Sequence, residues 1–371
     1  MKNIFRLASL LAAAVMLFAC EKLETGDGIM IVSDKDVIQS NGQDVATLRV
    51  MCGDKDVTAE SIIYDENDNV LDLKGGKFTA TADGEYRFWA EYGTFSTFDK
   101  ALDDNGLFVI KAISVPVPEA VKDTQAGNTS FVHRAFLTQY TGTACGYCPY
   151  MINILKQLEA KNTIPENAVL AAVHSYKASD PAYIAAPKVN SYPYLTVDLV
   201  TGFSHSAGAA ALETLVSESV SSSAKAGIAV NPIYYKEEGI LVVKVSVKAA
   251  VAGTFNVGAW LLEDDIYGMQ EDYDGIKKLD PENDYDTHES CVRVADSKFK
   301  GTWFGHLLGD MESGDVLEKT FVMNVKKAWK PENLHLAVFT SYGKKDGSKI
   351  SYSVCNVIDA PIDAPTPFEY K

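Results

Sequence analysis

After its first twenty residues the sequence contains no apolar run long enough to cross a bilayer as a helix, which needs about twenty consecutive apolar residues. It also has few basic residues. Lysine and arginine number 34 against 50 aspartates and glutamates, for a formal net charge of −16. A chain this acidic has no electrostatic attraction for a phosphate backbone, so nucleic acid is excluded as a partner. No phosphate-binding loop, Ser/His/Asp arrangement or internal repeat is present.

The N-terminus has the pattern of a secretory signal. Lys2 and Arg6 precede a short apolar run over 7–19, which is too short for a spanning helix. Leu17-Phe18-Ala19-Cys20 resembles a lipobox, in which the cysteine is diacylated and becomes the mature N-terminus. We therefore expect a lipoprotein signal peptide over 1–19, a lipid anchor at Cys20 and an exported chain. Loss of the two basic residues would bring the net charge from −16 to −18.

At 371 residues the chain is long for one core, and two or three domains are expected. A polar tether over 20–28 precedes short alternating apolar runs over 29–113, which predict an immunoglobulin-like β-sandwich. Asp83-Gly84-Glu85-Tyr86 is similar to the sandwich corner in which a tyrosine packs under a turn. Prolines and charges without periodicity mark 114–128 as a linker.

The rest of the chain is expected to form two further domains. Over 129–225 an apolar run, a helical pattern, the buried-type strand 168–174 and a second helical stretch predict an α/β domain. Over 226–360 strand patterns return and predict a second β-sandwich, followed by a tail over 361–371. This sandwich contains an acidic insertion, Glu271–Thr287, read as a solvated loop, with calcium binding as the alternative.

Cysteine is scarce, and the only close pair among the six is Cys145 and Cys148. A structural zinc site needs four ligands, so the scattered remaining cysteines favour a redox pair and no metal. The pair lies where an apolar run ends and a helix-periodic stretch begins. At such a junction the unpaired N–H groups and the dipole of the helix stabilise a thiolate over a thiol. Pro149 fits the first turn of that helix.

The segment Tyr140–Pro149 resembles the active-site segment of thioredoxin-fold proteins. Together with the lipobox it is similar to the lipoproteins related to outer membrane protein 28. The order of residues 261–266 (Leu-Leu-Glu-Asp-Asp-Ile), Gln270, His288 and Arg293 also follows that family. The resemblance covers about 131–359 and implies a thioredoxin-like central domain between the two sandwiches. It also implies an outer-membrane location, on the periplasmic face or at the cell surface.

The resemblance assigns roles to individual residues. Cys145 would be the exposed nucleophile, and Cys148 the resolving thiol that closes the Cys145–Cys148 disulfide. Pro193 would match the cis-proline that faces the pair, with Tyr192 presenting its backbone to the substrate. Gly146 and Tyr147, between the cysteines, form a dipeptide also seen in periplasmic disulfide isomerases. The expected activity is thiol–disulfide exchange, as a reductase or an isomerase.

Other positions leave alternatives open. Gln139 stands where the family commonly has a carboxylate, and Ala144 where an aromatic residue is common. His174 is expected to be a core histidine, and His288 and Arg293 to be structural. Cys52 reads as a small buried hydrophobe. Cys291 and Cys355 could form a disulfide or remain two buried thiols, and the sequence leaves both open.

Two functions remain possible at this stage. In the first, the chain exchanges disulfides with exported cysteine-containing proteins, needs no cofactor, and receives electrons from an unidentified thiol partner. In the second, it is a surface binding or adhesion lipoprotein whose Cys145–Cys148 disulfide is static. Gln139 and the two flanking sandwiches favour the second function, whereas the intact Cys-x-x-Cys with Tyr192-Pro193 favours the first.

Overall fold

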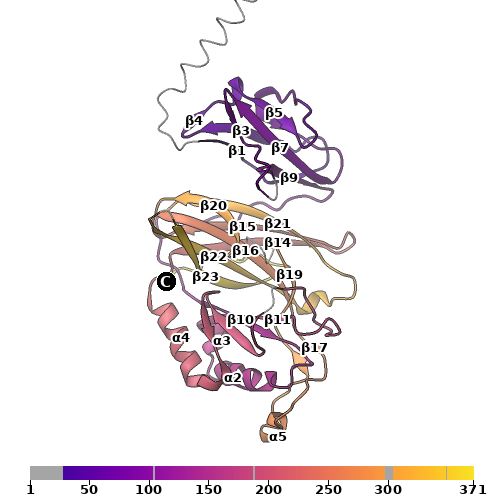
Figure 1. Cartoon of the computed structure of the whole chain (residues 1–371), viewed down its shortest axis with the longest axis vertical. Coiled ribbons are helices and arrows are strands. Elements are labelled where there is room, and N and C mark those ends of the chain that lie inside the picture. Colours follow the sequence, from indigo (N-terminus) through magenta and orange to yellow (C-terminus); the bar gives the residue numbers. More distant parts are fainter. Residues whose placement is uncertain (1–27, 103–104, 187–188, 297–303, 348) are drawn as a thin grey trace, which may run out of the picture. The chain divides into compact units, whose positions relative to one another are not determined.

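The computed structural model describes residues 28–102, 105–186, 189–296, 304–347 and 349–371. The chain divides between Val117 and Pro118 into two compact units, each with its own core (Figure 1). The described residues are mostly β-strand, with four short or medium α-helices. None of these helices is both long and apolar enough to span a membrane. The predicted signal peptide and Cys20 lie outside the described residues.

The first unit consists of two small antiparallel-rich sheets that face each other across an apolar core. One sheet contains β1 (Ile29–Ser33), β3 (Ala46–Cys52), β4 (Lys55–Asp56) and β6 (Lys77–Phe78). The other contains β2 (Val37–Gln39), β9 (Phe108–Ile113), β7 (Gly84–Tyr92), β5 (Ile62–Asp65) and β8 (Phe95–Ser96). Alternate residues of β3 are buried, and Cys52 lies in the core as expected. Two-sheet packing of this kind follows from the period-2 pattern of the strands.

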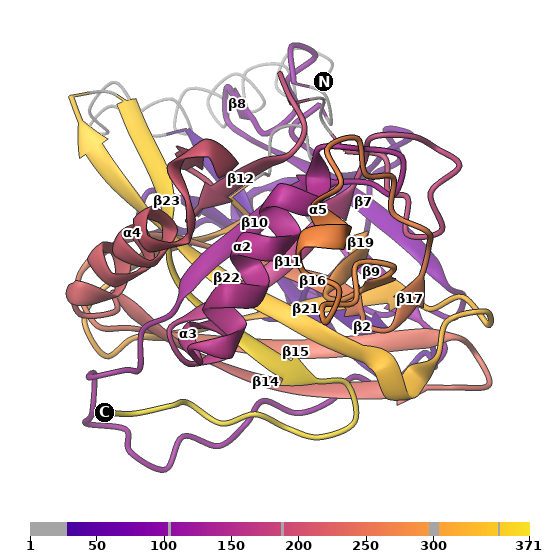
Figure 2. The ribbon, with the colours of Figure 1, turned by 90° about the horizontal axis from the view of Figure 1, so that it is seen from below.

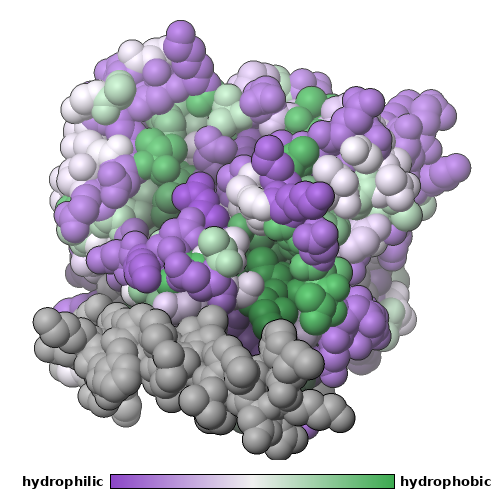
Figure 3. All heavy atoms as spheres, turned by 90° about the horizontal axis from the view of Figure 1, so that it is seen from above, coloured by the Kyte–Doolittle hydropathy of each residue, from purple (hydrophilic) through white to green (hydrophobic). Residues whose placement is uncertain are grey.

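The predicted tyrosine corner is present in this unit. The Tyr86 hydroxyl donates a hydrogen bond to the Ala82 carbonyl at 3.0 Å, back across the turn that precedes β7. Hydrophilic residues cover most of the face seen in Figure 3, with apolar areas between them. The immunoglobulin-like class of this unit stays a prediction.

The second unit is built around a nine-stranded mixed sheet of the described residues (Figure 2). Its order is β13 (Thr201–Phe203), β12 (Tyr194–Val197), β10 (Ala135–Thr141), β11 (Ala168–His174), β19 (Cys291–Ala295), β16 (Gly253–Glu263), β22 (Leu334–Asp346) and β23 (Lys349–Pro361), with β20 (His306–Met311) paired to β16. β10, β11 and β19 run parallel, whereas β12 is antiparallel to β10. The predicted strand 168–174 coincides with β11.

Helices cover one face of β10 and β11. These helices are α2 (Cys148–Ala160), α3 (Thr163–Glu166) and α4 (Ala209–Ser221), whereas the short α5 (Ile276–Leu279) lies in the insertion. Met151, Leu155 and Leu158 of α2 and Leu212 of α4 pack with Leu137 of β10 in one apolar cluster. The 3–4 residue spacing of the α2 residues places them on one helix face, as the sequence predicted.

The opposite face of β10 packs against strands from the C-terminal part of the chain. The Phe136 ring lies 5.2 Å from Trp260 of β16 and 5.1 Å from Phe339 of β22, between ring centroids. The sheet is therefore curled, so that strands several places apart touch. The prediction of separate domains on the two sides of 225/226 differs from this structure, because one sheet and one core cross that boundary.

A second sheet completes a β-sandwich. It contains β14 (Ala226–Tyr235), β15 (Ile240–Ala249) and β21 (Val316–Asn324), and its apolar side chains pack on those of β16, β22 and β23. Lys248 of β15 is 1% exposed and donates to Asp123 Oδ2 at 2.8 Å and to the Tyr370 hydroxyl at 3.2 Å. This buried ammonium ties the segment after the first unit and the C-terminal tail to the sandwich.

Candidate functional site

The Cys145–Cys148 disulfide is present at the junction between β10 and α2, where the sequence predicted it. After β10 ends at Thr141 the chain turns, with the Cys145 N–H donating to the Gly142 carbonyl at 2.9 Å. α2 begins at Cys148, and Pro149 occupies its first turn, where a missing N–H costs nothing. The disulfide therefore lies at the N-terminal, positive end of the helix dipole.

The exposure of Cys145 differs from the expectation. Cys145 is 4% exposed and Cys148 is fully buried. Cys145 is thus the more accessible of the two, as a nucleophile would be, but it is not an exposed residue. The cause is the segment that begins the acidic insertion, which lies against the loop between β10 and α2.

The insertion is docked on the cysteine loop and is not a freely solvated loop. The Glu271 N–H donates to the Thr143 carbonyl at 2.7 Å, and the Tyr273 N–H donates to the Gly146 carbonyl at 3.0 Å. A Cβ atom at Gly146 would come within 2.4 Å of the Tyr273 ring, so only glycine fits under this tyrosine. Gly146 therefore serves the close approach of the insertion, in addition to any effect on the cysteines.

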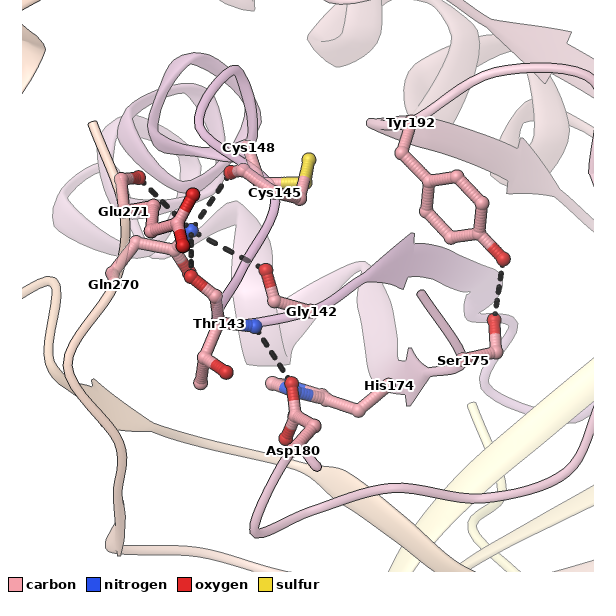
Figure 4. Close-up of a disulfide and its surroundings, with 10 residues drawn as sticks. All are labelled: Gly142, Thr143, Cys145, Cys148, His174, Ser175, Asp180, Tyr192, Gln270 and Glu271. Atoms are coloured by element: carbon pink, nitrogen blue, oxygen red, sulfur yellow. Dashed lines mark hydrogen bonds and ion pairs between the residues drawn. A yellow bond between two sulfur atoms is a disulfide. The ribbon is translucent and has the colours of Figure 1, made fainter. Parts of the chain in front are cut away.

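The Gln270 side chain, just before the insertion, also binds the cysteine loop. Its Nε2 lies 3.3 Å from the Gly142 carbonyl, 3.1 Å from that of Thr143 and 2.9 Å from that of Cys145 (Figure 4). The residue is 2% exposed, so these contacts are shielded from water. The sequence pointed to Gln270 only through the family resemblance and gave no reason to place it at the cysteines.

Asp180 supports the loop from another side. Its Oδ2 accepts from the Thr143 N–H at 2.6 Å and from His174 Nδ1 at 3.0 Å. Burial would raise the pKa of Asp180, but the hydrogen bonds from His174 and from backbone N–H groups outweigh it and lower the pKa to about 2. Asp180 is therefore a carboxylate that holds both the loop and His174. Sequence reasoning missed it, since a lone aspartate after a strand carries no signal.

His174 is a buried core histidine, as expected, and it contacts both Asp180 and Cys291. Since His174 Nδ1 donates to Asp180, its Nε2 is free to accept from the Cys291 thiol, whose Sγ lies 3.5 Å away. Burial raises the pKa of the Cys291 thiol well above its usual value. A fully buried thiol of this kind is an inert structural group.

The possible disulfide between Cys291 and Cys355 is not formed, and both residues are buried thiols. Cys291 lies on β19 and Cys355 on β23, and β16 and β22 separate these two strands in the sheet. Adjacent strands are about 4.8 Å apart, so three strand spacings exceed what a disulfide can bridge.

Tyr192 and Pro193 are joined by a cis peptide bond, as the resemblance implied. The Tyr192 hydroxyl is 2.9 Å from Ser175 Oγ, and its ring packs edge-on against Tyr176 at 5.1 Å between centroids. Figure 4 shows Tyr192 across from the disulfide, whereas Gln270 and Glu271 lie on the other side of it. Tyr147, exposed, packs edge-on against Tyr273 at 5.3 Å.

A small pocket of about 50 Å³ lies between α2 and the ends of β10 and β11. Gln139 and Thr141 line it, and both are at most 4% exposed. Among the described residues, neither the Gln139 Nε2 nor the Thr141 Oγ1 has a hydrogen-bond partner within the protein. Gln139 is therefore a buried amide beside this pocket, in the position where a carboxylate was expected.

His288 and Arg293 have structural contacts, as predicted. The His288 Nε2 is 2.9 Å from the Gly268 carbonyl, and burial lowers the pKa of its ring. Arg293 donates through Nη1 to the Pro181 carbonyl at 2.8 Å and through Nε to Glu263. Both side chains thus connect the C-terminal strands to the loops that hold the cysteine segment.

The carboxylates of the insertion are engaged locally. Asp272 accepts from the Ile276 and Lys277 N–H groups, both at 2.9 Å, and so caps α5. Asp286 pairs with Lys277 and accepts from the Gln270 N–H at 2.8 Å. Within the part of the chain that the structure describes, no group of three or more His, Cys, Asp or Glu side chains is arranged to hold a metal ion.

Comparison with known proteins finds a matching family and similar solved structures. Residues 180–364 match the family of outer membrane protein Omp28. The match contains Gln270 and His288 but begins after the cysteine pair. HBP35 of Porphyromonas gingivalis is a similar solved structure, with 14% sequence identity, a TM-score of 0.48, and coverage of 65% of this chain and 78% of that one. No curated protein shows significant sequence similarity to this chain.

Proposed function

We propose that the chain exchanges disulfides with exported cysteine-containing proteins through Cys145 and Cys148. The observation that carries the proposal is a Cys-x-x-Cys disulfide at the N-terminus of α2, where the helix dipole and unpaired N–H groups stabilise a thiolate. Cys145 precedes the helix and is the more accessible cysteine, which suits the attacking residue.

The exchange proceeds in two steps. In the reduced protein, the Cys145 thiolate attacks one sulfur of a substrate disulfide, forms a mixed disulfide with it and releases the other substrate sulfur as a thiolate. The Cys148 thiolate then attacks the Cys145 sulfur, breaks the mixed disulfide and releases the second substrate thiol. Two electrons pass to the substrate, and a dithiol partner restores the reduced pair. The same steps in reverse oxidise a substrate dithiol.

We further propose that residues 129–225 form a thioredoxin-like domain. The parallel pair β10 and β11, the antiparallel β12 and β13, and the helices α2 and α4 on one face support this class. The fold needs strands 291–295 and 253–263 as neighbours, so this domain and the C-terminal sandwich act as one body. We assign no dissociable cofactor to the exchange.

The proposed location is the cell envelope, with Cys20 as a lipid anchor in the outer membrane. The match of residues 180–364 to an outer membrane protein family supports this location, as does the lipobox-like sequence before Cys20. Its partners there are exported proteins with cysteines and a thiol that supplies or accepts electrons.

A second function is favoured by one observation. Because the insertion lies on the cysteine loop and leaves Cys145 only 4% exposed, the disulfide could serve as a static brace in a surface binding protein. Trapping separates the two functions. Cys148→Ala leaves Cys145 unable to resolve a mixed disulfide, so an oxidoreductase accumulates partners linked through Cys145. The Cys145→Ala/Cys148→Ala variant is the matched control. Absence of such adducts in cells that express Cys148→Ala supports the static brace.

A further inference from the structure

Two pairs of tyrosines lie near the cysteine loop. Tyr147 packs edge-on against Tyr273, which lies over Gly146, and Tyr176 packs edge-on against Tyr192. Tyr147 is 48% exposed and Tyr273 is 61% exposed, although large aromatic side chains are usually covered. Exposed aromatic faces beside a reactive disulfide form a surface on which a polypeptide segment can lie.

Carboxylates accompany the pair formed by Tyr147 and Tyr273. The Glu271 carboxylate is close enough to the Tyr273 hydroxyl to raise its pKa, and the Tyr150 hydroxyl donates to Asp274 at 3.0 Å. Glu271 and Asp274 are both exposed. The whole insertion carries seven carboxylates against two lysines. We name the group Tyr147, Glu271, Tyr273 and Asp274 the acidic rim of the site.

The chemistry of the acidic rim fits a cation. An aromatic face attracts an ammonium or guanidinium group, and nearby carboxylates strengthen the attraction. The pair formed by Tyr176 and Tyr192 already shows this contact, because the Lys177 ammonium lies 5.7 Å from the centre of the Tyr176 ring. Within the described residues, no lysine or arginine lies over Tyr147 or Tyr273. A substrate can therefore bring its own cation to the acidic rim.

We propose that the site prefers cysteine-containing segments with a lysine or arginine next to the cysteine. This preference rests on the proposed disulfide exchange and adds a substrate class to it. The substrate cysteine meets Cys145, and the neighbouring basic side chain lies on the acidic rim. The net charge of the chain, −16, favours the approach of the same basic segments over a longer range.

Three synthetic peptides test the preference. Each carries one cysteine in a mixed disulfide with 5-thio-2-nitrobenzoate, and the residue on each side of the cysteine is arginine, glutamine or glutamate. The reduced full chain attacks the peptide sulfur through Cys145 and releases the coloured thiolate, and Cys148 then frees the peptide as a thiol. We expect the second-order rate constant to be about three- to tenfold higher for the arginine peptide than for the glutamine peptide, and lowest for the glutamate peptide.

Variants assign the preference to the acidic rim. Glu271→Gln with Asp274→Asn removes two charges from it, and Tyr273→Leu removes the exposed ring. We expect each to reduce the arginine preference to less than twofold. Glu282→Gln removes a charge from a different part of the insertion and is the matched control, which should keep the preference. Added salt should weaken the preference of the unaltered protein.

Equal rate constants for the three peptides would overturn the preference and leave the exchange activity intact. A preference that survives Glu271→Gln with Asp274→Asn would also overturn it, since the acidic rim would not be its source. Failure of the proposed function is a different result. In that case no peptide reacts faster with the unaltered protein than with the Cys145→Ala variant.

Discussion

A substitution at Gln270 should weaken the binding of the insertion to the cysteine loop and leave the rest of the fold unchanged. Its amide has two N–H protons and reaches three carbonyls of the cysteine loop. Gln270→Met keeps the length of the side chain and removes both donors. A net contribution of about 0.5–1.5 kcal/mol for each hydrogen bond predicts that the insertion is held less tightly by about 1–3 kcal/mol. The loop carbonyls keep their backbone partners, so a larger loss is not expected.

Amide hydrogen exchange measures this effect where it arises. The N–H groups of Glu271 and Tyr273 donate to the cysteine loop, so they exchange only when the insertion lifts away. A loss of about 1–3 kcal/mol predicts exchange that is roughly 5- to 150-fold faster at these two amides. Gln157→Met, at an exposed glutamine on α2, is the matched control and should leave both rates unchanged.

The reasoning is refuted if both amides exchange at the same rate in Gln270→Met as in the unaltered protein. That result would mean that the backbone contacts alone hold the insertion. If exchange accelerates throughout the second unit and not only at the insertion, Gln270 supports the fold as a whole and is not a local fastener.

Three further perturbations follow from the contacts. Gly146→Ala should lower the free energy of unfolding by about 1–3 kcal/mol, because its Cβ collides with the Tyr273 ring. Adding Tyr273→Ala should restore part of that loss in a double-mutant cycle of urea unfolding, and additive losses would count against the collision. Lys248→Met should lower the stability of the second unit by about 3–5 kcal/mol, because Asp123 loses its buried partner, and an unchanged urea midpoint would contradict this. A hydrogen bond to Asp359 and an ion pair with Asp264 outweigh burial and raise the pKa of His335 to about 9. The stability that the charged ring contributes is therefore complete below about pH 6.5 and is lost as the pH rises through 9. His335→Gln should flatten this pH dependence of the urea midpoint, and an equal pH dependence in both proteins would be evidence against it.

Local features of the site were predictable from the sequence, because they depend on neighbours along the chain. The period of the apolar residues after Cys148 gave α2, and the continuous apolar run 168–174 gave β11. The spacing of Cys145 and Cys148 indicated a redox pair, and the resemblance to thioredoxin-fold proteins implied their disulfide. Each of these features depends on residues that are close together in the sequence.

Features that depend on distant pairing were not predictable in the same way. β11 pairs with β19 through Ala172 and Cys291, and no local pattern reports a contact across such a separation. This pairing joins the α/β part to the C-terminal sandwich and brings the insertion to the cysteine loop. It explains why the predicted boundary at 225/226, the predicted exposure of Cys145 and the prediction of a solvated insertion differed from the structure.

The central claim is that Cys145 and Cys148 are a working redox pair, and their reduction potential tests it most directly. Equilibration of the full chain with glutathione or dithiothreitol buffers, read by alkylation of the free thiols, gives the potential. The account predicts a value between about −270 and −120 mV, the range of thiol–disulfide oxidoreductases. A value below about −300 mV, as found for structural disulfides, would contradict it and favour the static brace.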